Sequence, residues 1–156
     1  MGIKNLNKYF YDKCSKKSIS KIHLRELSDK TIVIDTSIYL YHFLGENALM
    51  ENMYLFISIL KNYEIEPIFI FDGKTPQEKK SLVKERSQKK KDAEDKYNEL
   101  LRLKKEGKVD ELEDKSLQLE LEALKRQFVR LRNEDIVKVK ELMDAYGVIY
   151  YDAPYE

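Results

Sequence analysis

The chain has 156 residues, the size of about one domain, and its 42% of hydrophobic residues can form a core while 37% of charged residues favours long solvated helices. A single cysteine, Cys14, excludes an intramolecular disulfide, and without a membrane-length apolar run or a signal-peptide pattern we expect an intracellular protein with no membrane partner. The net charge of +1 conceals a basic block between Lys74 and Lys91, where eight basic residues outnumber two acids and predict an anionic partner.

The first half of the chain predicts two helical regions and two strands. Residues 3–13 favour a short helix, with Ile3, Leu6, Tyr9 and Phe10 on one side. Residues 31–35 and 67–71 are short apolar runs, which predict strands buried on both faces, as in a parallel sheet. Between them helical periodicity extends over residues 38–60, with an interruption near Gly45, Glu46 and Asn47.

The second half is mainly helical. Thr75 and Pro76 predict a helix N-cap and first helical residue, and the breaker Gly107 predicts a hairpin of about 76–106 and 109–132. An apolar stripe with coiled-coil spacing marks its second helix: Leu117, Leu121, Leu124, Phe128 and Leu131. A helix over 134–146, capped by Asn133 and Gly147, then leads into a third strand at 148–151.

This order predicts an α/β fold, with a parallel-sheet core and a long inserted helical hairpin. Parallel strands need crossover connections, but the second crossover is far longer than a crossover requires. An insertion of this kind is a functional device or an interaction module.

Acids stand where the predicted strands end. Asp35 and Asp72 directly follow two of them, and Glu156 comes after the third. Ligands bind beyond the carboxyl ends of parallel strands, and Mg²⁺ prefers carboxylate oxygens, so the three acids are candidate metal ligands. The alternative is an aspartate that serves only as a turn or cap residue.

Two phosphate-handling motifs fit less well. Gly73-Lys74-Thr75 resembles the end of a P-loop, but Ile68 stands where that motif needs glycine, and we reject it. Asp35-Thr36-Ser37 leaves an aspartyl-phosphate phosphatase as a weaker alternative, since Ser37 replaces the second acid of such enzymes.

Cations and one aromatic residue could hold a nucleic acid beside these acids. Lys79, Arg86 and Lys90 are spaced seven and four apart, which predicts one helical face close to Asp72. Such cations can position a phosphodiester, although a basic face can also be merely solvated. Tyr41 can stack on an unpaired base, with core packing as its alternative role.

Several motifs together resemble the N-terminal region of flap endonucleases, the XPG-type structure-specific 5′ nucleases. The resemblance extends over the whole chain and is carried by Met1-Gly2-Ile3, residues 32–37, residues 41–44, Phe71-Asp72-Gly73-Lys74-Thr75-Pro76 and Tyr151-Asp152-Ala153-Pro154-Tyr155-Glu156. It implies a PIN-like 5′-nuclease core in which the hairpin of about 76–132 is the arch that admits a 5′ single strand.

The resemblance also implies roles for the candidate residues. Asp35, Asp72 and Glu156 would be ligands of a Mg²⁺ site that holds two ions in the complete enzyme, with Mn²⁺ as a substitute. Lys79 and Arg86 would contact the scissile phosphate and Tyr41 would stack on a neighbouring base. Gly2 would lie close to the DNA. The spacing of Lys90 from Arg86, rather than the resemblance, makes Lys90 a further candidate for DNA binding.

The family pattern continues beyond Glu156 with further acids and a duplex-binding motif. We therefore expect residues 1–156 to be the N-terminal part of one nuclease domain, acting on DNA with a 5′ flap or free 5′ end in replication or repair. We expect little or no nuclease activity from this part alone. A sliding-clamp partner would bind through a region outside this chain.

Two other functions stay open at the level of sequence. One is a non-catalytic interaction module in which the hairpin binds a partner and the acids are structural. The other is a metal-dependent nuclease that acts on RNA.

Overall fold

A three-stranded parallel sheet forms the centre of the chain, for which a computed structural model describes residues 5–15, 18–106 and 111–155. The strands β1 (Thr31–Asp35), β2 (Glu66–Phe71) and β3 (Ile149–Asp152) lie in the order β1-β2-β3. The three predicted strands are therefore confirmed to within one residue at each end. Their parallel direction brings all three carboxyl ends to one edge of the sheet.

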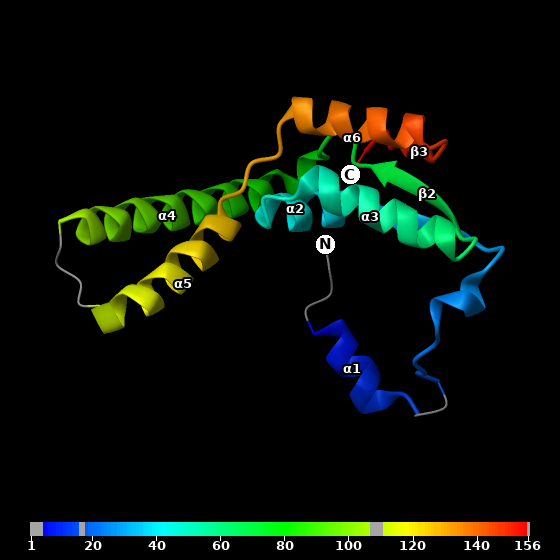
Figure 1. Cartoon of the computed structure of the whole chain (residues 1–156), viewed down its shortest axis with the longest axis horizontal. Coiled ribbons are helices and arrows are strands. Elements are labelled where there is room, and N and C mark those ends of the chain that lie inside the picture. Colours follow the sequence, from blue (N-terminus) through cyan, green and yellow to red (C-terminus); the bar gives the residue numbers. More distant parts are fainter. Residues whose placement is uncertain (1–4, 16–17, 107–110, 156) are drawn as a thin grey trace.

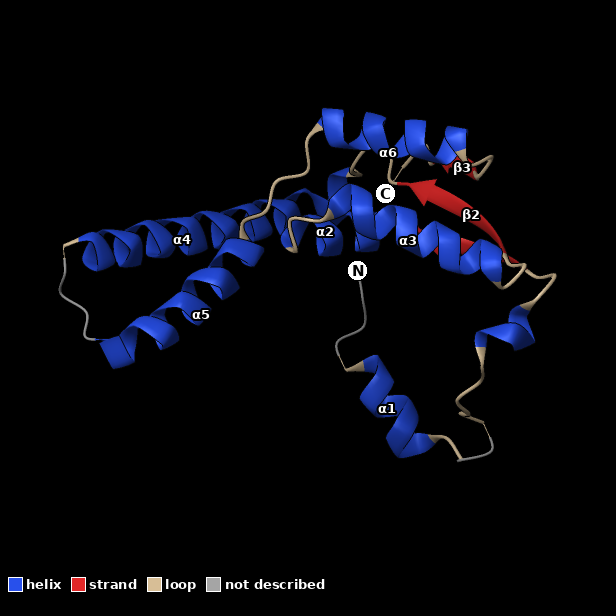
Figure 2. Cartoon of the chain, viewed as in Figure 1, coloured by secondary structure: helices blue, strands red, loops and turns tan. Residues whose placement is uncertain are grey.

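Three helices cover one face of the sheet. They are α2 (Thr36–Gly45), α3 (Leu49–Asn62) and α6 (Asn133–Ala145), and in the view of Figures 1 and 2 the β2 arrow lies between α3 and α6. The side chains between the helices and the sheet are fully buried, with 0% exposure at Met53, Ile57, Phe69, Val139 and Met143. The predicted α/β fold with one apolar core is confirmed.

The opposite face of the sheet is open, which corrects the prediction that the strands are buried on both faces. Val33 is 67% exposed, Ile149 51% and Tyr151 59%. Successive side chains of a strand point to opposite faces, so these residues lie opposite the buried Ile34 and Phe69. The register aligns Val33, Ile68 and Ile149 in one row across this open face.

The N-terminal helix is confirmed over a shorter range. The helix α1 (Leu6–Lys13) is followed by the short 3₁₀ helix η1 (Leu24–Leu27), and Figure 1 shows α1 standing apart from the sheet and its helices. None of the eight residues of α1 is buried, and Tyr9 and Phe10 are exposed. Ile3, the first residue of its predicted apolar side, lies outside the described residues.

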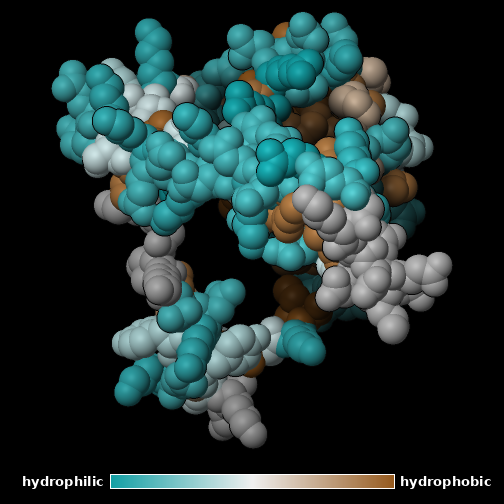
Figure 3. All heavy atoms as spheres, turned by 90° about the vertical axis from the view of Figure 1, so that its left-hand side faces the viewer, coloured by the Kyte–Doolittle hydropathy of each residue, from teal (hydrophilic) through white to brown (hydrophobic). Residues whose placement is uncertain are grey.

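The predicted helical hairpin is present and projects from the core. It comprises the 3₁₀ helix η2 (Gln77–Lys79), α4 (Lys80–Lys105) and α5 (Glu111–Gln127). Leu121 and Leu124 of the predicted stripe are buried, and Phe128 packs edge-on against Tyr97. Figure 3, which views the molecule from its hairpin end, shows a mostly hydrophilic surface. Within the described ranges no helix is long and apolar enough to span a membrane.

The ends of the hairpin differ from prediction. Thr75 is not an N-cap, because Lys74 forms a β-bridge with Tyr155 and keeps this segment extended until η2 begins. The second helix ends at Gln127 rather than near 132, and Leu131 packs instead against the main core. Gly107, the predicted breaker, lies outside the described residues.

Of the two caps predicted for α6, one is confirmed and one is wrong. Arg132, not Asn133, occupies the N-cap position, and its backbone N–H donates to Asp135 Oδ2 at 2.9 Å. The predicted C-cap is confirmed, because Gly147 adopts a φ of +59° and the Val148 N–H donates to the Met143 carbonyl at 2.9 Å.

Candidate metal and nucleic-acid site

Asp35 and Asp72 lie at the ends of neighbouring strands. Asp35 ends β1 and caps α2, since its Oδ1 accepts a hydrogen bond from the Ser37 N–H at 3.1 Å. The register pairs Asp35 with Ile70 of β2, so Asp72 lies two residues beyond the position opposite Asp35. Both side chains are exposed and line one cavity of about 1420 Å³ at the carboxyl ends of the strands.

Gly73 allows the segments after β2 and β3 to come together. An added Cβ at Gly73 would lie 1.9 Å from the Ala153 carbonyl oxygen, which only glycine avoids. The Ala153 N–H donates to the Phe71 carbonyl at 2.9 Å, which fixes the approach. The result is a narrow junction that holds Asp72 beside the end of β3.

A third carboxylate, Asp152, lines the same cavity and was missed as a site residue in the sequence. It ends β3 opposite Phe71 in the register. Lys140 Nζ contacts both of its oxygens, at 2.7 and 2.8 Å, so its negative charge is compensated within the fold. Its position at the end of a predicted strand could have marked Asp152 as a site residue. The lysine that pairs with it, Lys140, comes from α6 and could not be inferred from that strand.

Part of the cavity wall is basic. Arg86, Lys90 and Lys91 come from α4, while Arg126 and Arg130 come from the end of α5 and the residues after it. Arg130 also forms an ion pair with Glu94, at 2.6 Å. A cavity with acids on the strand ends and cations on the hairpin can hold a metal ion and an anionic group side by side.

Lys90 connects this wall to Tyr41. Its Nζ lies 4.7 Å from the centroid of the Tyr41 ring and donates to the Val129 carbonyl at 3.0 Å. Burial lowers the pKa of Lys90, and the positive charges of Arg130 and Arg86 lower it further. An anion placed among these cations would relieve their repulsion, so the wall favours a phosphate group.

The structure brings together only part of the predicted site. Asp35, Asp72, Tyr41, Arg86 and Lys90 all line the cavity. Lys79 is the last residue of η2 and the N-cap of α4, and it is not among the residues that line the cavity. The other two predicted residues, Gly2 and Glu156, lie outside the described residues.

The donor set suits a hard cation but is small. Asp35 and Asp72 offer carboxylate oxygens, which Mg²⁺ and Mn²⁺ accept as ligands. Within residues 5–15, 18–106 and 111–155, no group of three histidine, cysteine, aspartate or glutamate side chains is arranged to hold a metal ion. Of the candidate ligands Asp35, Asp72 and Glu156, the described structure places Asp35 and Asp72, and the third carboxylate of the cavity, Asp152, is paired with Lys140.

Solved structures with the same fold include nuclease cores. The chain aligns with "The catalytic core of Rad2 in complex with DNA substrate (complex III)" at a TM-score of 0.64 and 20% identity, covering 99% of this chain and 38% of that one. The catalytic core of Rad2 alone aligns at a TM-score of 0.60 and 20% identity, covering 100% and 35%. At this identity the likeness establishes the fold, which is PIN-like.

Curated relatives match the whole chain. It is 30% identical to a probable RAD2-like endonuclease 369L of Invertebrate iridescent virus 6, covering 100% of this chain and 48% of the relative. It is 28% identical to Flap endonuclease 1 of Glossina morsitans morsitans, covering 100% and 41%. The chain therefore spans less than half the length of these two relatives.

The family model for the XPG N-terminal domain matches residues 1–93, which include β1, β2, Asp35, Asp72 and the start of the basic helix. This match covers more than half of the chain. The resemblance seen in the sequence motifs is thereby confirmed, and the chain belongs to the XPG N-terminal domain family.

Proposed function

We propose that this chain is the N-terminal portion of a divalent-metal-dependent, structure-specific 5′ nuclease that cleaves DNA with a 5′ flap or free 5′ end in replication or repair. One observation carries the proposal: Asp35 and Asp72 open into the same cavity as Arg86 and Lys90. This juxtaposes ligands for a metal ion with partners for a phosphodiester. The names of the relatives, endonucleases and flap endonucleases, support the same reaction class.

Asp35 and Asp72 would hold Mg²⁺, or Mn²⁺ in its place, with Glu156 as a further ligand. When bound, the ions of such a site activate water for attack on the phosphodiester. Arg86, Lys90 and Lys79 would bind the phosphate and reduce the repulsion between its charge and the carboxylates. Gly2 would lie close to the DNA.

Tyr41 would stack on an unpaired base next to the phosphate. In the structure the Lys90 ammonium lies over its ring, at 4.7 Å from the centroid. A base that takes this ring face has to displace the ammonium, which can then pair with the phosphate of the same strand. Base stacking and phosphate binding would therefore occur in one step.

Metal titration tests the acid pair directly. Wild-type chain should bind Mn²⁺ in calorimetry, and Asp72→Asn should weaken the binding about tenfold or more, because half of the described donor set is lost. Asp95→Asn, a change of the same chemistry on exposed α4, should have no effect. Binding that does not depend on Asp72 would contradict the proposed metal site and favour an interaction module built on the hairpin.

Asp35 and Asp72 are fewer carboxylates than a two-metal centre needs, and Asp152 is paired with Lys140, so the chain alone should have little or no nuclease activity. Flap DNA incubated with Mg²⁺ and the purified chain should stay uncut. Mg²⁺-dependent cleavage that Asp72→Ala abolishes would show that residues 1–156 suffice.

Lys79 and Arg86 can act in cleavage or only in DNA binding, and the two roles can be separated in a fusion of this chain to the remainder of a flap endonuclease. There, Lys79→Ala and Arg86→Ala should lower the cleavage rate more than the affinity for DNA. Equal losses of rate and affinity would show that these residues only bind. Matched DNA and RNA flaps in the same assay distinguish a DNA nuclease from one that acts on RNA.

A further inference from the structure

Lys90 differs from its neighbouring lysines on α4 in what surrounds its amine. Lys89 forms an ion pair with Glu85 at 2.6 Å, and Lys96 forms one with Glu120 at 2.7 Å. Within residues 5–15, 18–106 and 111–155, no ion pair engages Lys90. A paired carboxylate stabilises the charged ammonium form of a lysine, and Lys90 lacks this stabilisation in the described part of the chain.

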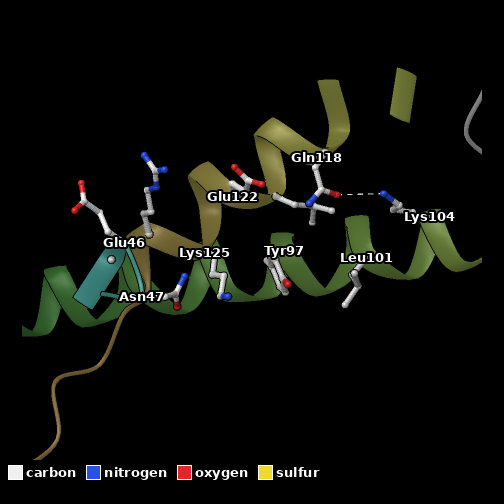
Figure 4. A pocket seen from close by; sticks show the side chains of 11 residues that line it. Glu46, Asn47, Tyr97, Leu101, Lys104, Gln118, Glu122 and Lys125 are labelled. Atoms are coloured by element: carbon white, nitrogen blue, oxygen red, sulfur yellow. Dashed lines mark hydrogen bonds between the residues drawn. The ribbon is translucent and has the colours of Figure 1, made fainter. Parts of the chain in front are cut away.

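The position of Lys90 also separates it from the lysines deeper in the hairpin. A smaller cavity of about 460 Å³ lies between α4, α5 and residues 45–47, and Figure 4 shows its lining, in which Lys104 donates to Gln118 at 3.2 Å. Among the described residues, the lysines that line the cavity of the strand-end acids are Lys90 and Lys91. Lys91 is exposed and Lys90 is half-buried, so Lys90 is the lysine of this cavity that is shielded from water.

Shielding and neighbouring cations favour the neutral amine of Lys90. Its Nζ donates to the Val129 carbonyl at 3.0 Å, which holds the end of the side chain in place. Burial lowers the pKa of Lys90, and the charges of Arg130 and Arg86 lower it further. A larger share of Lys90 than of a solvated lysine is therefore neutral at a given pH. A lysine amine that is desolvated or lies next to other cations is a nucleophile that forms Schiff bases with carbonyl compounds.

The Tyr41 ring indicates which carbonyl compound this amine can meet. The Nζ of Lys90 lies 4.7 Å from the centroid of the ring, on the face where an unpaired base would stack in the proposed function. A nucleotide that has lost its base cannot displace the amine, which then stays beside the sugar. The open-chain form of such a sugar has an aldehyde at C1′. Arg86 and Lys91 line the same cavity and can bind the flanking phosphates.

We propose that Lys90 is the nucleophile of a second, metal-independent activity, a lyase reaction at abasic sites in DNA. The Nζ attacks the C1′ aldehyde, and one water leaves as the protonated imine forms. Solvent water then removes a proton from C2′, and the electron pair of that C–H bond becomes the C2′–C3′ double bond. The C3′–O bond breaks, and its electron pair leaves with the 3′ phosphate.

Hydrolysis of the imine uses one water, restores the Lys90 amine and releases an unsaturated aldehyde at the end of the DNA. The steps need no metal, oxidant or reductant. The inference rests on the proposed function in one respect, because it requires DNA to enter the cavity of Asp35 and Asp72. It does not require those acids to bind a metal ion.

Trapping with sodium cyanoborohydride tests the imine, which this reagent reduces to a stable secondary amine. The whole chain is incubated in EDTA with a labelled single-stranded oligonucleotide that has one central abasic site. Wild-type chain should form a covalent protein–DNA adduct, and without the reductant it should cut the strand at the abasic site. Mass spectrometry of the digested adduct should place the modification on Lys90.

Lys90→Arg separates attack on the sugar from binding of DNA. Arginine keeps a cation over the Tyr41 ring, so the affinity for an intact oligonucleotide in anisotropy should stay within about twofold. The adduct and the strand cleavage should both fall about tenfold or more, because a guanidinium stays protonated and is not a nucleophile. Lys89→Arg, at an exposed position of the same helix, is the matched control and should change neither.

Three results would overturn the lyase. They are the absence of any adduct, an undiminished adduct in Lys90→Arg, and an adduct that maps to another lysine or to the N-terminal amine. Circular dichroism of each variant checks that the fold is intact. Pyridoxal 5′-phosphate, an aldehyde with a phosphate group, tests the amine without DNA: after reduction it should label Lys90 more than Lys89, and equal labelling would contradict the proposal.

The two proposals fail separately. The Mn²⁺ titration measures Asp35 and Asp72 without DNA, and the trapping assay measures Lys90 without metal. Loss of Mn²⁺ binding with an intact Lys90 adduct overturns the nuclease and leaves the lyase. Mn²⁺ binding that depends on Asp72, without an adduct at Lys90, leaves the metal site and removes the lyase.

Discussion

The sheet core and the helical hairpin are stabilised by different contacts. In the core, helices α2, α3 and α6 cover the sheet with side chains such as Met53, Phe69 and Met143 that have no exposed surface. In the hairpin, Ala93, Leu121 and Leu124 are the buried apolar residues among the described side chains, and exposed ion pairs such as Lys96–Glu120 accompany them. Burial of apolar surface stabilises a fold far more than exposed ion pairs do, so the sheet core is the more stable of the two regions.

This difference divides the candidate site into a fixed and an adjustable half. Asp35 and Asp72 are attached to strands of the core, whereas Arg86, Lys90 and Arg130 are attached to the hairpin. In the proposed function, Asp35 and Asp72 hold a metal ion, and a metal site needs ligands in closely fixed positions, which strands of a packed core provide.

Loss of a core side chain should have the largest effect. Phe69→Ala should lower the free energy of unfolding by about 3–5 kcal/mol, because it empties a fully buried site that also contacts Phe56. Urea denaturation followed by circular dichroism measures the change. Val33→Ala, on the open face of the neighbouring strand, is the control and should change stability little. Similar losses in both variants would contradict a one-sided core.

Loss of a hairpin side chain should have a smaller and local effect. Leu121→Ala should destabilise the hairpin by about 2 kcal/mol, the low end for a buried leucine, because few other contacts depend on it. Hydrogen exchange should accelerate in peptides of α4 and α5 and stay unchanged in β2. Leu119→Ala, on the exposed side of the same helix, is the matched control. Equal acceleration in β2 would show that the two regions unfold together.

The smallest effect concerns the charge of Lys90. Arg130→Gln should raise the pKa of Lys90, because one of the cations that lowers it is removed. NMR titration of the labelled lysine Cε measures the shift, and Arg102→Gln, further along α4, should leave it unchanged. A lysine pKa lowered by folding means that the unfolded chain binds more protons, so stability rises with pH just below the ordinary lysine range. Arg130→Gln should reduce that rise.

Local patterns in the sequence were sufficient for the elements and for the strand-end acids. Apolar runs located the strands that carry Asp35 and Asp72, and Gly147 marked a helix end that needs a positive φ. Thr75 had the local signature of an N-cap, but a bridge between Lys74 and Tyr155 overrode it. Contacts between residues far apart in the sequence decided that position.

The same limit applies to the site. The pairing of Asp152 with Lys140 and the position of Lys90 over Tyr41 join different elements, and no spacing in the sequence encodes them. Burial could not be predicted for the open face of the sheet. The sequence of β1 and β3 shows which residues are apolar, but not whether another element packs against them.

Two contacts at the base of the hairpin join α4 to the residues that follow α5. Lys90 is bound to Val129 and Glu94 to Arg130, so α4 and the residues after α5 are tied together near the core. From Glu94 to Lys105 the helix continues for about 16 Å without leaving α4. A small rotation of α4 about these two contacts would therefore move the far end of the helix more than it moves the base.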